Sequence, residues 1–313
     1  RVLELDPNSV DAMVGLAVIE LNSESPDSVM KAMKLVRDAY RIDKNDSRVL
    51  NHLANHFFYK KDYAKTQSLA KLAFNNTDVD KIKAESFYHM GRAYHAQGDF
   101  EAAFDCYYES VRRWPEYALA ISALAQMYVH KGEHEKAIIH LEKVVAQYPD
   151  SFESLKMLGH LYHITGKTGA AVQHFKRAVK VRSNDVDAWV EYGQLLENDK
   201  VNLALSAYQK AAAIMRKEGN PVPPELLNDI GVLHCRTEDY ANAFPVFEEA
   251  LQSIPAGSPR AITIKYNLAR LHELTNSYAI ATDMYKEIIK DAPSYVDCYM
   301  RLGCIARAKG QTF

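Results

Sequence analysis

One short stretch of the sequence, Ala84–Pro115, contains two helical patterns separated by Gly98 and Asp99. On each side, apolar residues recur three and four positions apart, which places them on one face of a helix. Glycine ends a helix at low cost because it adopts the left-handed conformation, and aspartate is a good residue to begin the next helix. The stretch therefore predicts a hairpin of two helices that closes at Pro115.

The same pattern recurs immediately downstream, in copies that begin at Ala118 and Phe152. The spacing matches the tetratricopeptide repeat, a helix–turn–helix of about 34 residues in which small and large residues alternate at fixed positions. Because three copies follow one another at one period, the match is specific. The residues at positions 7, 8 and 11 of these copies are Met90, Gly91 and Tyr94, then Leu124, Ala125 and Tyr128, then Leu158, Gly159 and Tyr162.

Further copies extend the pattern over the whole chain. We interpret residues 1–9 as the tail of a preceding repeat, 10–295 as eight tandem repeats and 296–313 as the first helix of a ninth. Neither end carries the polar capping helix that repeat arrays need, so we expect the chain to be a section of a longer array. The expected repeat starts are Val10, Ser47, Ala84, Ala118, Phe152, Val186, Pro224, Ile262 and Val296.

The repeat pattern also predicts the fold class. A single hairpin cannot bury its apolar face alone, so neighbouring hairpins stack and share a continuous core. The tetratricopeptide resemblance implies an all-α, right-handed superhelical solenoid, with first helices lining a concave groove and second helices facing outward. Pro245 falls inside a predicted second helix and removes a backbone donor, so we expect a kink or a late helix start there.

Charge and hydropathy exclude two classes of partner. The 313 residues carry a net charge of −2 with 25% charged residues, so no basic field favours nucleic acid. No apolar run reaches the 18 or so residues of a membrane span, so we expect no membrane insertion. The four cysteines are scattered without a CxxC pair, which is typical of reduced packing residues.

Motifs for catalysis, cofactors or metals are absent from the sequence. It contains no HExxH, GxGxxG, P-loop or GxSxG motif. Histidine pairs spaced three or four apart can ligate a metal from one helix face, but no cysteine clusters beside them. We therefore predict a non-enzymatic chain without catalytic, cofactor or metal residues. The histidine pairs are His52 and His56, His130 and His134, and His160 and His163.

Candidate binding residues come from the repeat positions expected to line the groove. They mix aromatic, amide and cationic side chains, which suits a protein segment with some acidic character. The alternative is that they are ordinary solvated residues of helices. The candidates are Asn51, Asn55, Phe58, Tyr59, Tyr88, Arg92, His95, Lys156, His160, His163, Tyr266 and Arg270.

Four stretches go beyond the generic repeat, and together they cover the chain in collinear order. They resemble the large tetratricopeptide subunit of the polymerase-associated factor (Paf) complex, and the repeat pattern alone explains none of their residues. The stretches are Asn51–Phe58 with Lys60–Tyr63, Val222–Asn228, Tyr266–Leu271 and Tyr295–Gly303.

This resemblance implies a nuclear scaffold of RNA polymerase II transcription elongation. Such a scaffold would organise the other Paf subunits, bind the Paf subunit itself as a segment along the array, and support histone H2B ubiquitination and H3 methylation. Nuclear placement comes from the resemblance alone, because the sequence has no Lys/Arg-rich nuclear signal.

Two other functions remain open at this point. One is a scaffold of another multiprotein machine, such as a ubiquitin ligase or a trafficking complex. The other is the regulatory array of an enzyme whose catalytic domain lies outside the chain. Sugar transferases with tetratricopeptide arrays have an asparagine at position 6 of successive repeats. In this chain, Asn267 is the one asparagine among the nine residues at that position. Direct nucleic-acid binding is disfavoured by the near-neutral charge.

Overall fold

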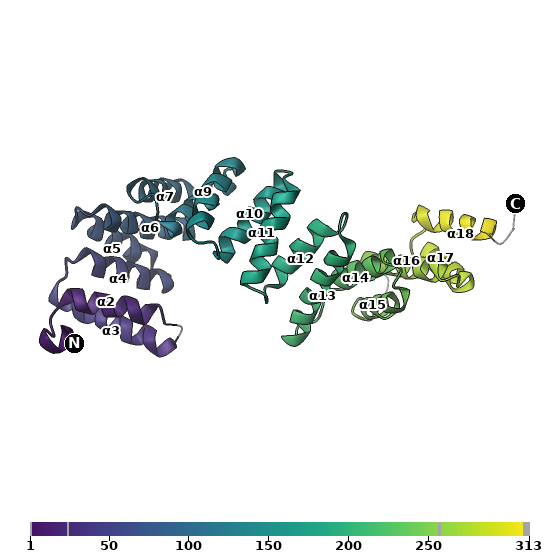
Figure 1. Cartoon of the computed structure of the whole chain (residues 1–313), viewed down its shortest axis with the longest axis horizontal. Coiled ribbons are helices and arrows are strands. Elements are labelled where there is room, and N and C mark those ends of the chain that lie inside the picture. The colour runs from purple at the N-terminus through teal and green to yellow at the C-terminus, as the bar shows by residue number, and fades with distance from the viewer. Residues whose placement is uncertain (1, 24, 256–257, 309–313) are drawn as a thin grey trace. The chain divides into compact units, whose positions relative to one another are not determined.

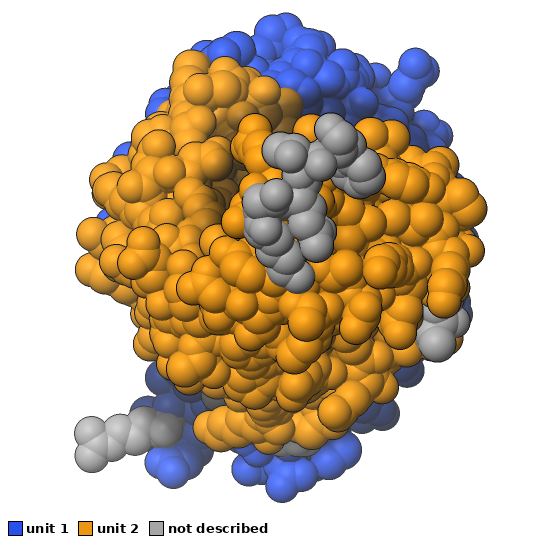
Figure 2. Space-filling model, turned by 90° about the vertical axis from the view of Figure 1, so that its right-hand side faces the viewer, with its two compact units in different colours: residues 1–154 blue, residues 155–313 orange. Residues whose placement is uncertain are grey.

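The computed structural model describes residues 2–23, 25–255 and 258–308, and within these ranges it consists of 18 helices and no strand (Figure 1). The chain divides into two compact units, Arg1–Ser154 and Leu155–Phe313 (Figure 2, blue and orange). Helix α10 contributes residues to both.

The helices form successive antiparallel hairpins. In unit 1 the pairs α2–α3 to α8–α9 pack as hairpins, and in unit 2 the pairs α12–α13 to α16–α17 do so. Each unit is thus a solenoid of helical hairpins, which confirms the predicted all-α repeat fold. The first helices are α2 (Val10–Leu21), α4 (Ser47–Tyr59), α6 (Asp80–Ala96), α8 (Ala118–His130), α10 (Phe152–Ile164), α12 (Val186–Leu196), α14 (Pro224–Arg236), α16 (Pro259–Leu274) and α18 (Val296–Ala308). The other helices are α1 (Val2–Leu5), α3 (Pro26–Ile42), α5 (Tyr63–Asn75), α7 (Phe100–Arg113), α9 (His134–Gln147), α11 (Thr168–Val181), α13 (Val201–Lys217), α15 (Tyr240–Gln252) and α17 (Tyr278–Asp291).

Most first helices begin at the expected residue, but two begin about one turn earlier. Helix α6 starts at Asp80, four residues before Ala84. Helix α16 starts at Pro259, where the Ser258 hydroxyl accepts a hydrogen bond from Ala261 N at 3.2 Å. Proline at the first helical position lacks only a donor that would be unpaired there anyway. The Ser258 cap and Pro259 therefore account for the start of α16, whereas no side chain caps α6 at Val79.

The expected late helix start at Pro245 is wrong. Helix α15 begins at Tyr240 and passes through Pro245. The packed side chains on both sides of the proline outweigh the one lost backbone hydrogen bond, since Ala243, Phe247 and Ala250 are fully buried. The division into residues 1–9, eight repeats over 10–295, and 296–313 stays a prediction. Residues 1 and 309–313 lie outside the described part of the chain.

Several hairpin turns place a left-handed residue two positions after the end of the first helix. Gly98 has φ +82°, and Asp99 then caps α7 by accepting a hydrogen bond from Ala102 N at 3.1 Å. Glycine adopts this conformation without a steric penalty. Three hairpins place a residue with a side chain at the equivalent position. These residues are Lys61, Glu238 and Asn276, with φ of 60°, 60° and 59°.

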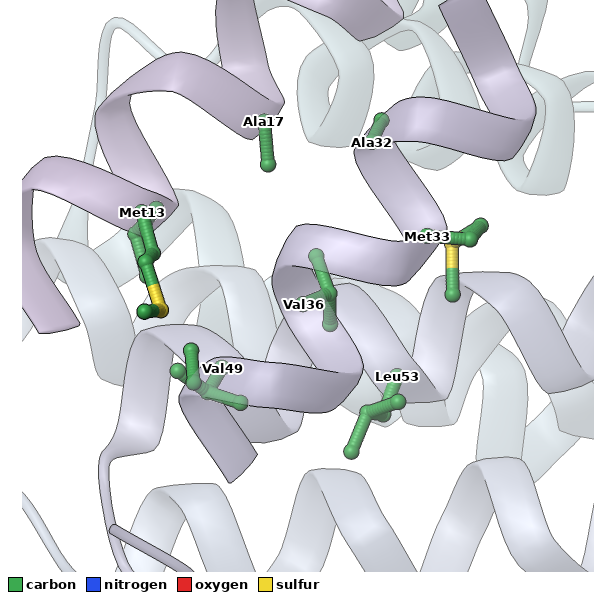
Figure 3. Packing of buried hydrophobic residues seen from close by; sticks show 9 residues of the cluster. Met13, Ala17, Ala32, Met33, Val36, Val49 and Leu53 are labelled. Atoms are coloured by element: carbon green, nitrogen blue, oxygen red, sulfur yellow. The ribbon is translucent and has the colours of Figure 1, made fainter. Parts of the chain in front are cut away.

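The core runs between stacked hairpins. At the N-terminal side of unit 1, side chains from α2, α3 and α4 converge, among them Met13, Val36 and Leu53 (Figure 3). Ala17 and Ala32 are fully buried at the same contact. Small residues let the two helices of the first hairpin approach, and the larger side chains fill the space toward α4. This core thus holds α2, α3 and α4 against one another.

A candidate groove on the first helices of unit 1

A pocket of about 410 Å³ opens on the first helices of unit 1. We call it the Arg92 pocket. Its walls come from α4 and α6, with Val18 and Leu21 of α2 on one side and Tyr117 and Leu119, at the start of α8, on another. Five of the predicted groove residues line it, namely Asn51, Asn55, Tyr59, Tyr88 and Arg92.

Arg92 is held by rings and an amide. Its guanidinium carbon lies 3.8 Å from the ring centre of Phe58, 5.3 Å from that of Tyr59 and 5.5 Å from that of Tyr88. Its Nη1 donates to Asn55 Oδ1 at 2.7 Å. Within the part of the chain that the structure describes, no carboxylate forms an ion pair with Arg92. The guanidinium is therefore oriented without being ion-paired to any described residue, and cation–π contact fixes its plane.

Asn51 forms the floor of the Arg92 pocket and joins α4 to α6. It is 2% exposed, its Nδ2 donates to the Ile82 carbonyl at 3.2 Å, and its Oδ1 accepts from Ser86 Oγ at 2.9 Å. A buried amide used in this way holds two helices in register. Burial raises the pKa of the neighbouring Glu85 carboxyl, and a hydrogen bond with Asn51 opposes that rise.

Burial favours the neutral form of two histidines in the pocket. Burial lowers the pKa of His52. Burial, with smaller contributions from Arg92 and His52, lowers the pKa of His89 to about 3. His89 is 9% exposed, and its Nδ1 has no hydrogen-bond partner among the described residues. Arg92 is consequently the cation of this pocket at neutral pH.

His95, also predicted for the groove, packs inside its own hairpin. Its ring centre lies 5.6 Å from that of Phe100 and 6.4 Å from that of Tyr107. Burial, and to a lesser extent His130, lowers its pKa. It does not line the Arg92 pocket, and its contacts join α6 to α7.

Two of the three predicted residues on α10, Lys156 and His160, pair with α12 and its preceding loop. Lys156 Nζ lies 3.0 Å from Asp185 Oδ1 and 3.4 Å from Asp187 Oδ2. Burial lowers the pKa of Lys156, but the hydrogen bond to Asp185 and the nearby charges outweigh it, so the pKa is raised. His160 Nδ1 lies 3.3 Å from Glu191 Oε2, and His163 is exposed.

The predicted residues on α16 make contacts within their own neighbourhood. The ring centre of Tyr266 lies 5.8 Å from that of Tyr285 and 5.3 Å from that of Tyr295. Arg270 Nη1 donates to Glu273 Oε2 at 2.9 Å. Two hairpins separate α10 from α16 in the chain, so the five unit 2 candidates belong to separate places along the array.

A second pocket of unit 1, of about 780 Å³, lies where two inter-hairpin loops meet, and we call it the Trp114 pocket. The rings of Trp114 and Tyr117 stack at 4.7 Å with an interplanar angle of 9°. Leu119 and Tyr148 are 56% and 54% exposed. Tyr117 and Leu119 line both this pocket and the Arg92 pocket. Sequence reasoning missed it, although an aromatic residue precedes each of the repeat-ending prolines Pro115 and Pro149.

Both pockets are lined by aromatic, apolar and polar side chains. Over the described ranges, no cluster of three or more His, Cys, Asp or Glu side chains is arranged to hold a metal ion. None of the described helices has the length and apolar character needed to cross a membrane. Stacked rings, an oriented guanidinium and exposed apolar side chains are features of protein-binding surfaces.

Comparison with known proteins agrees with the repeat architecture. The family described as tetratricopeptide repeat matches residues 82–150 and 116–184, and a second family of the same description matches 157–217. The crystal structure of YrrB, a tetratricopeptide-repeat protein, superposes on 63% of this chain and 97% of its own, with a TM-score of 0.53 and 19% identity. At that identity the likeness concerns the fold.

Two relatives match the chain from end to end. The RNA polymerase-associated protein CTR9 of Caenorhabditis elegans is 35% identical over 342 residues, covering 100% of this chain and 30% of the relative. The CTR9 homolog of Arabidopsis thaliana is 32% identical, covering 99% of this chain and 32% of the relative. The chain thus spans about a third of the length of these relatives. Over its whole length the chain is Ctr9-like in sequence, and its fold is that of the tetratricopeptide-repeat proteins.

Proposed function

We propose that the chain is a non-catalytic scaffold of the Paf complex and acts in the nucleus during RNA polymerase II transcription elongation. The end-to-end similarity to proteins named RNA polymerase-associated CTR9 supports this assignment. The Arg92 pocket is the observation that carries the binding role, because its cation is oriented yet has no ion-pair partner in the described residues. The net charge of −2 favours a protein partner over nucleic acid.

The partner we propose for this surface is the Paf subunit, bound as a segment along the first helices. Asn55, Tyr59, Tyr88 and Arg92 would contact it directly. Asn51, Phe58 and His95 would act indirectly, by holding the helices and the guanidinium in place. Lys156, His160, His163, Tyr266 and Arg270 remain proposed contacts of unit 2.

A role in histone modification follows from this scaffold function and is part of the proposal. The chain itself would supply no catalytic group to H2B ubiquitination or H3 methylation. It would hold other Paf subunits near the polymerase, where the modifying enzymes act. Loss of the scaffold would then lower both modifications without changing the activity of the purified enzymes.

The experiment that tests this function is affinity purification of the tagged chain from nuclear extract of its own organism, with mass spectrometry of the bound proteins. We expect Paf subunits and RNA polymerase II. Recovery of an unrelated assembly instead would leave the repeat fold intact and overturn the proposed function. An Arg92→Glu variant run in parallel is expected to lose the Paf subunit first.

A further inference from the structure

The two pockets of unit 1 adjoin each other and differ in chemistry. Tyr117 and Leu119 line both of them. The Arg92 pocket carries an unneutralised guanidinium, whereas the Trp114 pocket carries stacked rings and exposed apolar side chains. A ligand that fills both must therefore change from polar to apolar within one short segment.

The occupant of the Arg92 pocket is specified by charge. Arg92 has five N–H donors, and its hydrogen bond within the described residues goes to the neutral amide of Asn55. A carboxylate matches the planar guanidinium fork and adds charge-assisted hydrogen bonds. Glu85 shares the pocket, so a single carboxylate is accommodated better than a dianionic phosphate.

The apolar side chains and the carboxylates that line the Trp114 pocket determine which side chain can bind there. Exposed Leu119 and Tyr148 beside the stacked Trp114 and Tyr117 rings form the kind of surface that an aromatic or large aliphatic side chain fills. Carboxylates of Glu116 and Asp150 also line the pocket. They would repel a second acidic residue at this end.

We propose that unit 1 recognises a protein segment that places a carboxylate side chain on Arg92 and, a few residues away, an aromatic or large aliphatic side chain in the Trp114 pocket. The segment crosses from the first helices to the inter-hairpin loops over Tyr117 and Leu119. This inference rests on the proposed use of the first helices as a partner surface. Purified components test it independently of membership in the Paf complex.

The probe is a phage-displayed library of random dodecapeptides selected on the purified chain. We expect enriched peptides to share an Asp or Glu at a fixed spacing from a Trp, Phe or Leu. Synthetic versions should bind Arg92→Gln and Leu119→Asp about tenfold more weakly than the unmodified chain, as expected for the loss of one charged or one apolar anchor.

Matched variants control for general effects. Arg112→Gln removes an exposed arginine of α7, and Ile139→Asp places an acid at a residue of α9 that is 53% exposed, similar to Leu119. Both are expected to bind the peptides normally. Thermal unfolding followed by circular dichroism checks that Arg92→Gln is folded. Because Leu119 is exposed, Leu119→Asp tests the proposal even if Arg92→Gln fails to fold.

Three results would overturn the proposal. One is a selection that enriches no sequence with this pairing of acidic and apolar residues. Another is equal binding of the selected peptides to a folded Arg92→Gln or Leu119→Asp variant. The third is tighter binding after the acidic residue is replaced by phosphoserine, because that would identify a phosphate rather than a carboxylate as the ligand of Arg92.

Discussion

A Cβ atom built on Gly159 would lie 2.6 Å from Cδ2 of Phe175, which faces it from the second helix of the same hairpin. Phe175 is fully buried, so its ring has little room to move. We predict that Gly159→Ala lowers the free energy of unfolding by about 1–3 kcal/mol through overpacking, and that Gly159→Leu disrupts the hairpin locally. Urea unfolding followed by circular dichroism measures the change.

Gly15 of α2 provides the control for this prediction. A Cβ built there meets nothing within 4 Å. Because alanine is a better helix former than glycine, Gly15→Ala should raise the free energy of unfolding by about 0.5–1 kcal/mol. Equal effects of the two alanine variants would contradict the role assigned to the contact between Gly159 and Phe175.

The turn residue Glu238 offers a stabilising substitution. It is exposed and has φ +60°, the position that Gly98 occupies in another hairpin. A residue with a Cβ costs about 1 kcal/mol or more in this conformation. We predict that Glu238→Gly raises the unfolding midpoint in urea, and that Glu238→Ala, which retains a Cβ, does not. A lower midpoint for Glu238→Gly would show that this turn is unstrained.

His89 predicts a dependence of stability on pH. Its pKa is about 3 in the folded chain and near 6.5 when unfolded, so only the unfolded state binds the proton between these values. The contribution of His89 to the free energy of unfolding is therefore fully present above pH 6.5 and decreases as the pH falls toward 3. From pH 7 to 5.5 the expected loss is about 1 kcal/mol.

A His89→Leu variant isolates this effect. The depressed pKa of His52 acts in the same direction and the raised pKa of Glu85 in the opposite one, but both groups remain in the variant. The difference between the two proteins therefore reports on His89. If acid lowers the free energy of unfolding of the variant as much as that of the unmodified chain, His89 is not neutral in the folded state.

Much of the fold could be predicted from the sequence because two periodicities constrain it, that of the helix and that of the repeat. The helical period fixes which face is buried, and the position within the repeat fixes which residues of successive hairpins adjoin. Asn55 and Arg92 occupy position 9 of consecutive repeats, so their contact follows from the register. The early starts at Asp80 and Pro259 could not be predicted from the repeat pattern, because that pattern does not specify whether the helix extends before its first position.

The candidate site was predictable only in part. Repeat positions identified Tyr59, Tyr88 and Arg92 as groove residues. They cannot distinguish an exposed amide from a buried one, and Asn51 is buried and hydrogen-bonded to α6. The Trp114 pocket is lined in part by inter-hairpin loops, to which the helical period does not apply. Side chains such as Tyr148 therefore escaped the pattern.

The central claim is that the Arg92 pocket binds the Paf subunit. Isothermal titration of the purified Paf subunit into the chain tests it most directly, with Arg92→Glu and Tyr59→Ala as variants and Arg112→Glu and Tyr108→Ala as controls on α7. Tyr59 and Tyr108 are both exposed, at 73% and 50%. We predict about tenfold weaker binding for the two pocket variants, typical of an interface anchor, and unchanged binding for the controls. Unchanged affinity in both pocket variants, with native unfolding curves, would contradict the account.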